Sequence, residues 1–246
     1  MSSSTQNARQ AQEALDSNHS QSPLQPIRTN PSPVSQAARH IHPVLLLAVF
    51  AFGFDSLVSD PISSMRSALP IAIVVQAAYA FLCLPVIGSQ ASKASRKPRP
   101  GEKKTGADGP RSNMFVAAFL SLLLSIFISP LFHVAMVLCG APMLTHIPHT
   151  FLCALHLSIL TLFPVFYVRG SESPSWLAVS SFRAPFDETF GGLVGGVVGA
   201  WLGAFPIPLD WDREWQKWPV PILCGVYAGY VVGKVIGGSL VFGKKF

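Results

Sequence analysis

Acidic, basic and aromatic side chains alternate in one short stretch of the chain, GAFPIPLDWDREWQKWP at residues 203–219. Its three carboxylates are close enough in sequence to act as a general acid and base, or to hold Ca²⁺ or Mg²⁺. Two bases lie among these acids, and so short a segment cannot enclose a dry pocket. The stretch therefore favours docking of a partner or a lipid headgroup over catalysis. Its charged residues are Asp210, Asp212, Arg213, Glu214 and Lys217.

Histidine and cysteine are the other side chains that could do chemistry, as ligands of zinc. The histidines in or beside apolar segments are His133, His146, His149 and His156, and the cysteines are Cys83, Cys139, Cys153 and Cys224. No cysteine or carboxylate completes a tetrahedral set with these histidines, and no nucleophile or phosphate-binding motif is present. We therefore predict no catalytic residue, no metal site and no cofactor, and we interpret the cysteines as small apolar side chains.

Composition places these residues in a membrane protein. Half of the 246 residues are hydrophobic and only 12% are charged, against about 25% in a typical soluble domain. Much of the net charge of +6 lies between Lys93 and Arg111. No aromatic residue is interleaved with these bases, which argues against nucleic-acid binding and favours anionic lipid headgroups.

Six segments approach the length of about 20 apolar residues that crosses a bilayer. They are 43–62, 68–88, 114–138, 149–168, 189–206 and 219–242. We expect residues 1–42 to form a disordered cytoplasmic tail, 43–242 a six-helix domain with a basic cytoplasmic loop at 89–113, and 243–246 a cytoplasmic end. Because bases gather on the cytoplasmic side of membrane proteins, both termini are expected in the cytosol and 207–218 on the opposite side, which is the lumen if the membrane is that of the endoplasmic reticulum.

Glycine recurs every four residues in the last two segments. Four residues advance about 400° around an α-helix, so each set forms one stripe along a helix face. Two such stripes let helix backbones meet closely in a membrane. We therefore predict a helical hairpin packed through Gly191, Gly195, Gly199, Gly203, Gly225, Gly229, Gly233 and Gly237.

The charged and aromatic stretch at 203–219 is then the turn of that hairpin. Pro206 and Pro208 end the fifth helix, because proline lacks an N–H and disfavours helix before it. Trp211, Trp215 and Trp218 suit the aromatic belt at the non-cytoplasmic membrane surface. This turn, with Asp210, Asp212 and Arg213, is the predicted site of partner contact.

Two ionisable residues lie inside predicted spans, where a charge suggests function. Asp55 lies about twelve residues into the first span, and we expect it to face the interior of the bundle. Lys234 lies near the cytoplasmic end of the last span, from which its ammonium can reach the surface. These residues and the glycine-rich helices support an alternative function, a small-solute transporter or lipid scramblase. A third hypothesis is a lipid-modifying enzyme that uses Asp210 or Asp212.

The sequence resembles a known family. FDETFGGLVGGVVGAWLGAFPIPLDWDREWQKWP at 186–219 and GYVVGKVIG at 229–237 are similar to the C-terminal signature of the PIG-F family, and GAP at 140–142 and PHTFLCALHLSILTLFPV at 148–165 resemble its middle helices. The resemblance covers about residues 43–242. This sequence departs from the family pattern at Glu214, where the family is expected to have proline.

The resemblance implies an all-α polytopic membrane protein of the endoplasmic reticulum with a non-catalytic role. Proteins of this family bind and stabilise the large subunits that transfer ethanolamine phosphate to the glycosylphosphatidylinositol (GPI) anchor. The implied partners are large subunits of the PIG-O and PIG-G type, with membrane lipids and the GPI precursor as further candidates and no nucleic acid.

Overall fold

The computed structural model describes residues 24–87, 109–209 and 211–245. Helices and turns make up the structure of these residues, and no strand occurs among them. The helices are α2 (Pro33–Phe52), α3 (Phe54–Ser59), α4 (Pro61–Cys83), α6 (Gly109–Leu138), α7 (Ile147–Arg169), α8 (Ser173–Ser180), α9 (Glu188–Gly203) and α10 (Val220–Gly238), with a 3₁₀ turn η1 (Glu214–Gln216) before α10. Most of the predicted basic loop, 89–113, lies outside the described residues.

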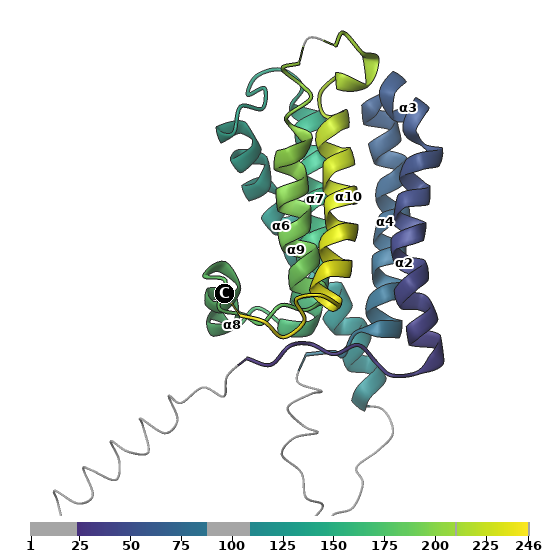
Figure 1. Cartoon of the computed structure of the whole chain (residues 1–246), viewed down its shortest axis with the longest axis vertical. Helices are drawn as coiled ribbons and strands as arrows, with labels where there is room; N and C mark the ends of the chain where they lie inside the picture. Colours follow the sequence, from purple (N-terminus) through teal and green to yellow (C-terminus); the bar gives the residue numbers. More distant parts are fainter. Residues whose placement is uncertain (1–23, 88–108, 210, 246) are drawn as a thin grey trace, which may run out of the picture.

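Six of these helices run side by side along the length of the molecule (Figure 1). Helix α7 lies at the centre, in contact with α4, α6, α9 and α10. Every residue of α7 from His156 to Arg169 is buried, whereas the outer helices expose large apolar side chains along much of their length. An apolar exterior around a buried central helix is the arrangement expected of a helix bundle that sits in lipid. The prediction of an all-α polytopic membrane protein is confirmed.

Five of the described helices are long and apolar enough to cross a membrane: α2, α4, α6, α7 and α10. Helix α9 is shorter, at 16 residues, but lies alongside α10 in the bundle (Figure 1). It corresponds to the fifth predicted span, 189–206. The last four predicted spans agree closely with α6, α7, α9 and α10.

The first two spans were predicted too far along the chain. Helix α2 begins at Pro33, so residues 33–42, which we predicted to be tail, form its first turns. Ser32 caps this helix, since its hydroxyl accepts a hydrogen bond of 3.2 Å from the Ser35 N–H, and proline at the first helical position is favourable. The helix then breaks at Gly53. Counting apolar residues missed this start because the first turns of α2 carry polar side chains.

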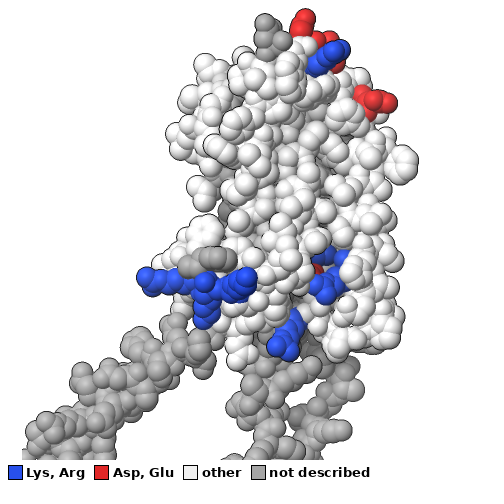
Figure 2. All heavy atoms as spheres, in the orientation of Figure 1, with Lys and Arg blue, Asp and Glu red and all other residues white. Residues whose placement is uncertain are grey.

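Charge divides unequally between the two ends of the bundle (Figure 2). The end with α3 and η1, which we call the acidic end, carries Asp55, Asp60, Asp212 and Glu214, together with Arg66, Arg213 and Lys217. The end with α8, which we call the basic end, exposes Arg28, Arg183, Lys244 and Lys245, with Glu172 as an acid. Of the residues that the structure describes, the first and the last both lie at the basic end (Figure 1).

Candidate functional site

Two rows of glycine bring α9 and α10 into backbone contact. A Cβ atom on Gly195 would lie 2.7 Å from the Gly233 Cα, and one on Gly199 would lie 2.8 Å from the Gly229 Cα. Real Cβ atoms essentially never come within 3.0 Å of such neighbours, so a larger residue requires one helix to move. We call this contact the glycine seam. It contains all eight glycines predicted at the hairpin: Gly191, Gly195, Gly199, Gly203, Gly225, Gly229, Gly233 and Gly237.

A cluster of charged and polar side chains is buried beside the seam, towards the basic end. Lys234 of α10 is only 2% exposed, and its ammonium lies 3.1 Å from His42 Nδ1 and 3.7 Å from Glu188 Oε2. The Glu188 carboxylate also pairs with Arg39 and accepts a hydrogen bond of 2.5 Å from the Tyr79 hydroxyl. The Tyr79 ring lies 3.8 Å from the Lys234 ammonium, a cation–π contact. These residues join α2, α4, α9 and α10.

Gln76 extends this cluster to the centre of the bundle. Its amide nitrogen donates to the Leu160 carbonyl of α7 at 2.8 Å, so its oxygen is an acceptor only. The ring of His42 must then donate from Nε2 to that oxygen, at 3.0 Å, and its Nδ1 accepts from Lys234. The Tyr230 hydroxyl donates to the same oxygen at 3.3 Å. Neutral His42 of α2 therefore links the ammonium of Lys234 on α10 to the buried amide of Gln76 on α4.

The residue before Glu188 organises a second buried ion pair. Asp187 is 1% exposed and caps α9, accepting hydrogen bonds from the backbone N–H groups of Thr189 at 2.9 Å and Phe190 at 3.0 Å. Its other carboxylate oxygen lies 2.5 Å from Arg169 Nη2 and accepts from the Ile27 N–H at 3.1 Å. Capping and a negative charge both stabilise the N-terminus of a helix. Asp187 thereby fixes the start of α9 against α7.

Asp187→Asn is expected to lower the free energy of unfolding by about 2 kcal/mol, because asparagine still caps the helix but cannot pair with the buried Arg169. Asp60→Asn is the matched control. Asp60 caps α4 through the Ser63 N–H at 3.2 Å and is exposed, so this change should cost no more than about 0.5 kcal/mol. Unfolding in mild detergent measures both. Equal losses at the two sites would contradict a role for the Arg169 pair.

The four histidines considered in the sequence analysis do not gather at one site. His156 joins three helices: its Nε2 donates to the Met65 carbonyl at 3.0 Å and its Nδ1 accepts from the Tyr227 hydroxyl at 2.8 Å. His149 lies against His146, with ring centroids 5.0 Å apart, while His133 packs near Phe151. Among the described residues, no group of three or more His, Cys, Asp or Glu is placed to hold a metal ion.

The predicted luminal turn is held by a residue that we did not single out, Gln216. Its amide nitrogen donates to the carbonyls of Pro206 at 2.6 Å and Leu209 at 2.9 Å, and its oxygen accepts from the Arg213 N–H at 2.8 Å. Trp218 then donates to the Thr150 hydroxyl at 3.1 Å, which ties the turn to α7. The turn is thus anchored to the centre of the bundle.

The remaining predicted residues of the turn lie on its outside. The rings of Trp211 and Trp215 are 5.9 Å apart, and Trp211 is 54% exposed. Pro208, Asp212 and Glu214 are exposed as well. Asp210 lies outside the described residues. The exposed indole and carboxylates leave this turn available for contact with another molecule.

Two predictions about ionisable residues were wrong. Asp55 is exposed at the start of α3, beyond the break at Gly53, instead of facing the interior of the bundle. The error follows from the misplaced first span, and it removes one of the residues that supported the transport alternative. Lys234 does not reach towards the surface, because Glu188 and His42 hold it inside the bundle.

The buried polar residues around Lys234 were missed, although the sequence carries a signal for some of them. Asp187 and Glu188 stand directly before an apolar, glycine-rich segment. A buried acid requires a paired base, and Lys234 is a base in the adjacent span. The sequence could have suggested that pairing. Each of these charges has an oppositely charged partner within the bundle, with Arg39 and Lys234 sharing Glu188, so the arrangement holds helices together.

Comparison with known proteins adds to this geometry. Residues 41–238 match the GPI biosynthesis protein family Pig-F. The chain is 54% identical over 223 residues to "Glycosylphosphatidylinositol anchor biosynthesis protein 11" of Neurospora crassa, covering 91% of this chain and 82% of that protein. It is 42% identical over 119 residues to the "GPI ethanolamine phosphate transferase, stabilizing subunit" of Mus musculus, covering 47% of this chain and 54% of that protein. No solved structure matches the chain.

Proposed function

Because this chain belongs to the GPI biosynthesis protein family Pig-F, we propose that it is a non-catalytic, stabilising subunit of a GPI ethanolamine phosphate transferase in the membrane of the endoplasmic reticulum. The observation that carries this proposal is the extent of the family match, which runs from within α2 to the end of α10. The name of the mouse relative supports the stabilising role. The paired charges of the bundle are consistent with a protein that positions a partner.

The partner in this proposal is a large transferase subunit of the PIG-O or PIG-G type. A stabilising subunit needs a rigid surface that keeps its shape while the partner assembles on it. The glycine seam, the cap at Asp187 and the anchored turn at Gln216 would provide that rigidity. The exposed face of the turn, with Trp211 and Asp212, is the contact surface that we propose on the luminal side.

Affinity purification of the full chain from endoplasmic reticulum membranes, in mild detergent, tests the proposal. A large ethanolamine phosphate transferase subunit is expected to co-purify. Depletion of the chain should lower the amount of that subunit and cause GPI precursors that lack ethanolamine phosphate to accumulate. Transfer of ethanolamine phosphate by the purified chain alone would overturn the non-catalytic role, and purification without any transferase subunit would overturn the assignment of the partner.

We also propose that the basic end faces the cytosol, which places both termini there. The exposed bases at that end, including Lys244 and Lys245, support this orientation through the positive-inside rule. Six crossings return the chain to the side on which it started.

Cys139 provides a test of orientation, because it is exposed at the acidic end, whereas Cys83 and Cys153 are buried. A membrane-impermeant thiol reagent should label Cys139 only after sealed endoplasmic reticulum vesicles are permeabilised. The control is Ser239→Cys, at the exposed basic end of α10, which should be labelled in sealed vesicles. The reverse pattern would invert the proposed topology.

A further inference from the structure

The outer face of the α9–α10 hairpin carries a groove of about 650 Å³, a size typical of small-molecule sites. The glycine seam forms its floor. Its walls are apolar side chains at four-residue spacing on each helix: Val194, Val198 and Leu202 from α9, and Ala228, Val232 and Ile236 from α10. In Figures 1 and 2 this face points towards the viewer, and its middle carries no charged side chain.

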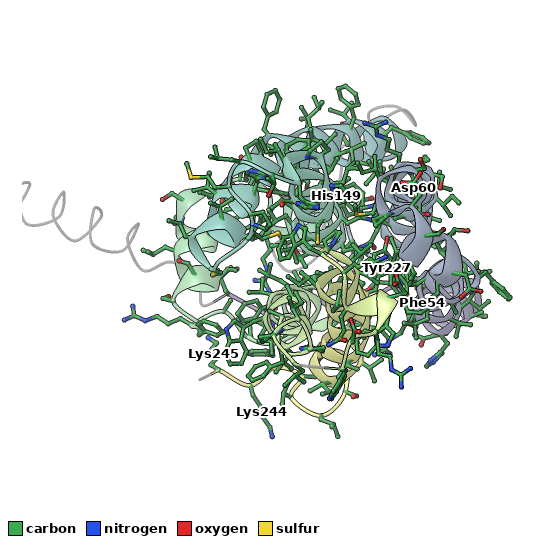
Figure 3. The ribbon with its side chains drawn as sticks, turned by 90° about the horizontal axis from the view of Figure 1, so that it is seen from above. Phe54, Asp60, His149, Tyr227, Lys244 and Lys245 are labelled. Carbon is green, nitrogen blue, oxygen red and sulfur yellow. The ribbon has the colours of Figure 1, made fainter. Side chains whose placement is uncertain are left out.

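Basic residues lie at one mouth of this groove. Phe186 lines the groove at the basic end and is hydrogen-bonded to the segment after α10: its N–H donates to the Lys244 carbonyl at 2.9 Å, and its carbonyl accepts from the Gly243 N–H at 2.8 Å. These bonds hold Lys244 and Lys245 beside the mouth, where both side chains are exposed and project outward from the bundle (Figure 3).

We propose that this groove binds an acyl chain of an anionic phospholipid whose headgroup is held by Lys244 and Lys245. An apolar furrow that ends at two cations matches an amphipathic ligand with an apolar tail and a negative head. Each lysine near the headgroup region attracts anionic lipid. With the basic end in the cytosol, the lipid would come from the cytoplasmic leaflet, where anionic phospholipids are concentrated.

The shape of the groove favours an acyl chain over a helix of another protein. An α-helix with its side chains is about 10 Å across, and packed helix axes usually remain about 8–10 Å apart. A helix would therefore rest on the walls formed by Val198 and Val232 and leave the glycine floor uncovered. An acyl chain carries no side chains and can lie directly on the half-buried backbone of Gly195 and Gly229.

Native mass spectrometry of the purified full chain tests this proposal without a transferase subunit. The protein is reconstituted with phosphatidylcholine containing a minority of phosphatidylserine, extracted in mild detergent, and analysed for retained lipid. We expect one retained phospholipid, with phosphatidylserine enriched at least about tenfold over its share of the mixture. Retention in proportion to the mixture would overturn the role of the two lysines.

Two pairs of variants separate the tail from the headgroup. Ala228→Phe fills the groove from its exposed wall and should reduce retained lipid about tenfold, since the tail is excluded. Val197→Phe adds the same ring on an exposed position of α9 outside the groove, and should retain lipid like the unmodified chain. Lys244→Ser with Lys245→Ser should still retain phospholipid but lose the enrichment of phosphatidylserine, whereas Arg213→Ser with Lys217→Ser should keep it.

The variants in the groove and at the two lysines give independent results. Unchanged lipid retention in Ala228→Phe would overturn the groove as the site. If that variant retained lipid but lost co-purification with a transferase subunit, the groove would be the seat of a partner helix and the proposal would be wrong. The lysine variants lie outside the packed bundle, so their result does not depend on whether Ala228→Phe folds.

Discussion

Gly199→Leu is expected to lower the free energy of unfolding by at least about 3 kcal/mol. A Cβ at this position would lie 2.8 Å from the Gly229 Cα, and the obstruction is backbone, which cannot move aside as a side chain can. The two helices must separate, and the contacts of neighbouring glycines, such as Gly195 with Gly233, are lost with them. Thermal unfolding in mild detergent measures the loss, and under the proposed function the abundance of the transferase subunit should fall.

The matched control is Val197→Leu, two residues away on the same helix. Val197 is 43% exposed, so a larger aliphatic side chain there meets lipid and should change stability by no more than about 0.5 kcal/mol. If Gly199→Leu unfolded at the same temperature as Val197→Leu, the seam would not hold the hairpin together.

Glu188→Gln is expected to lower the free energy of unfolding by about 3 kcal/mol, because removing one member of a buried ion pair leaves the other uncompensated. Glu188 lies among Arg39, Tyr79 and Lys234, and the side chain of Lys234 is only 3% exposed. Glutamine keeps the shape of the side chain but cannot balance the buried ammonium. The same unfolding measurement in detergent gives the loss.

A second substitution shows whether the uncompensated charge is the cause. Adding Lys234→Met to Glu188→Gln removes the ammonium, so the double variant should recover at least half of the lost stability. The exposed pair of Glu214 with Lys217 provides the comparison, since its lysine is 58% exposed. Glu214→Gln should cost less than about 1 kcal/mol. A double variant less stable than Glu188→Gln alone would show that Lys234 stabilises the bundle through other contacts.

The hairpin of α9 and α10 could be predicted from the sequence because its signal is local and periodic. A four-residue spacing of glycine within one segment specifies which face of a helix is small, and a second segment with the same spacing suggests what lies against it. The structure places all eight of these glycines between the two helices. The prolines and tryptophans between the segments marked the turn for the same reason.

The buried polar cluster could not be predicted in the same way, because its members come from distant parts of the chain. His42 and Gln76 are 34 residues apart, and His42 and Lys234 are 192 apart. Which polar residue of one span faces which residue of another depends on how the helices rotate against each other, and apolar counting does not determine that rotation. The prediction for Asp55 was wrong for a simpler reason: the first helix begins and ends earlier in the chain than its apolar residues indicate.

The brevity of α9 bears on the membrane in which this protein is most stable. Its 16 residues rise about 24 Å, less than the average hydrocarbon thickness of about 30 Å and nearer to the value of about 27 Å for the endoplasmic reticulum. In the thicker, sterol-rich plasma membrane, α9 would have to thin its surroundings locally, with a small free-energy cost for each ångström of mismatch. Mismatch of this kind would make α9 the span that favours a thin bilayer, because α4 and α7, at 23 residues each, are long enough to cross a thicker one.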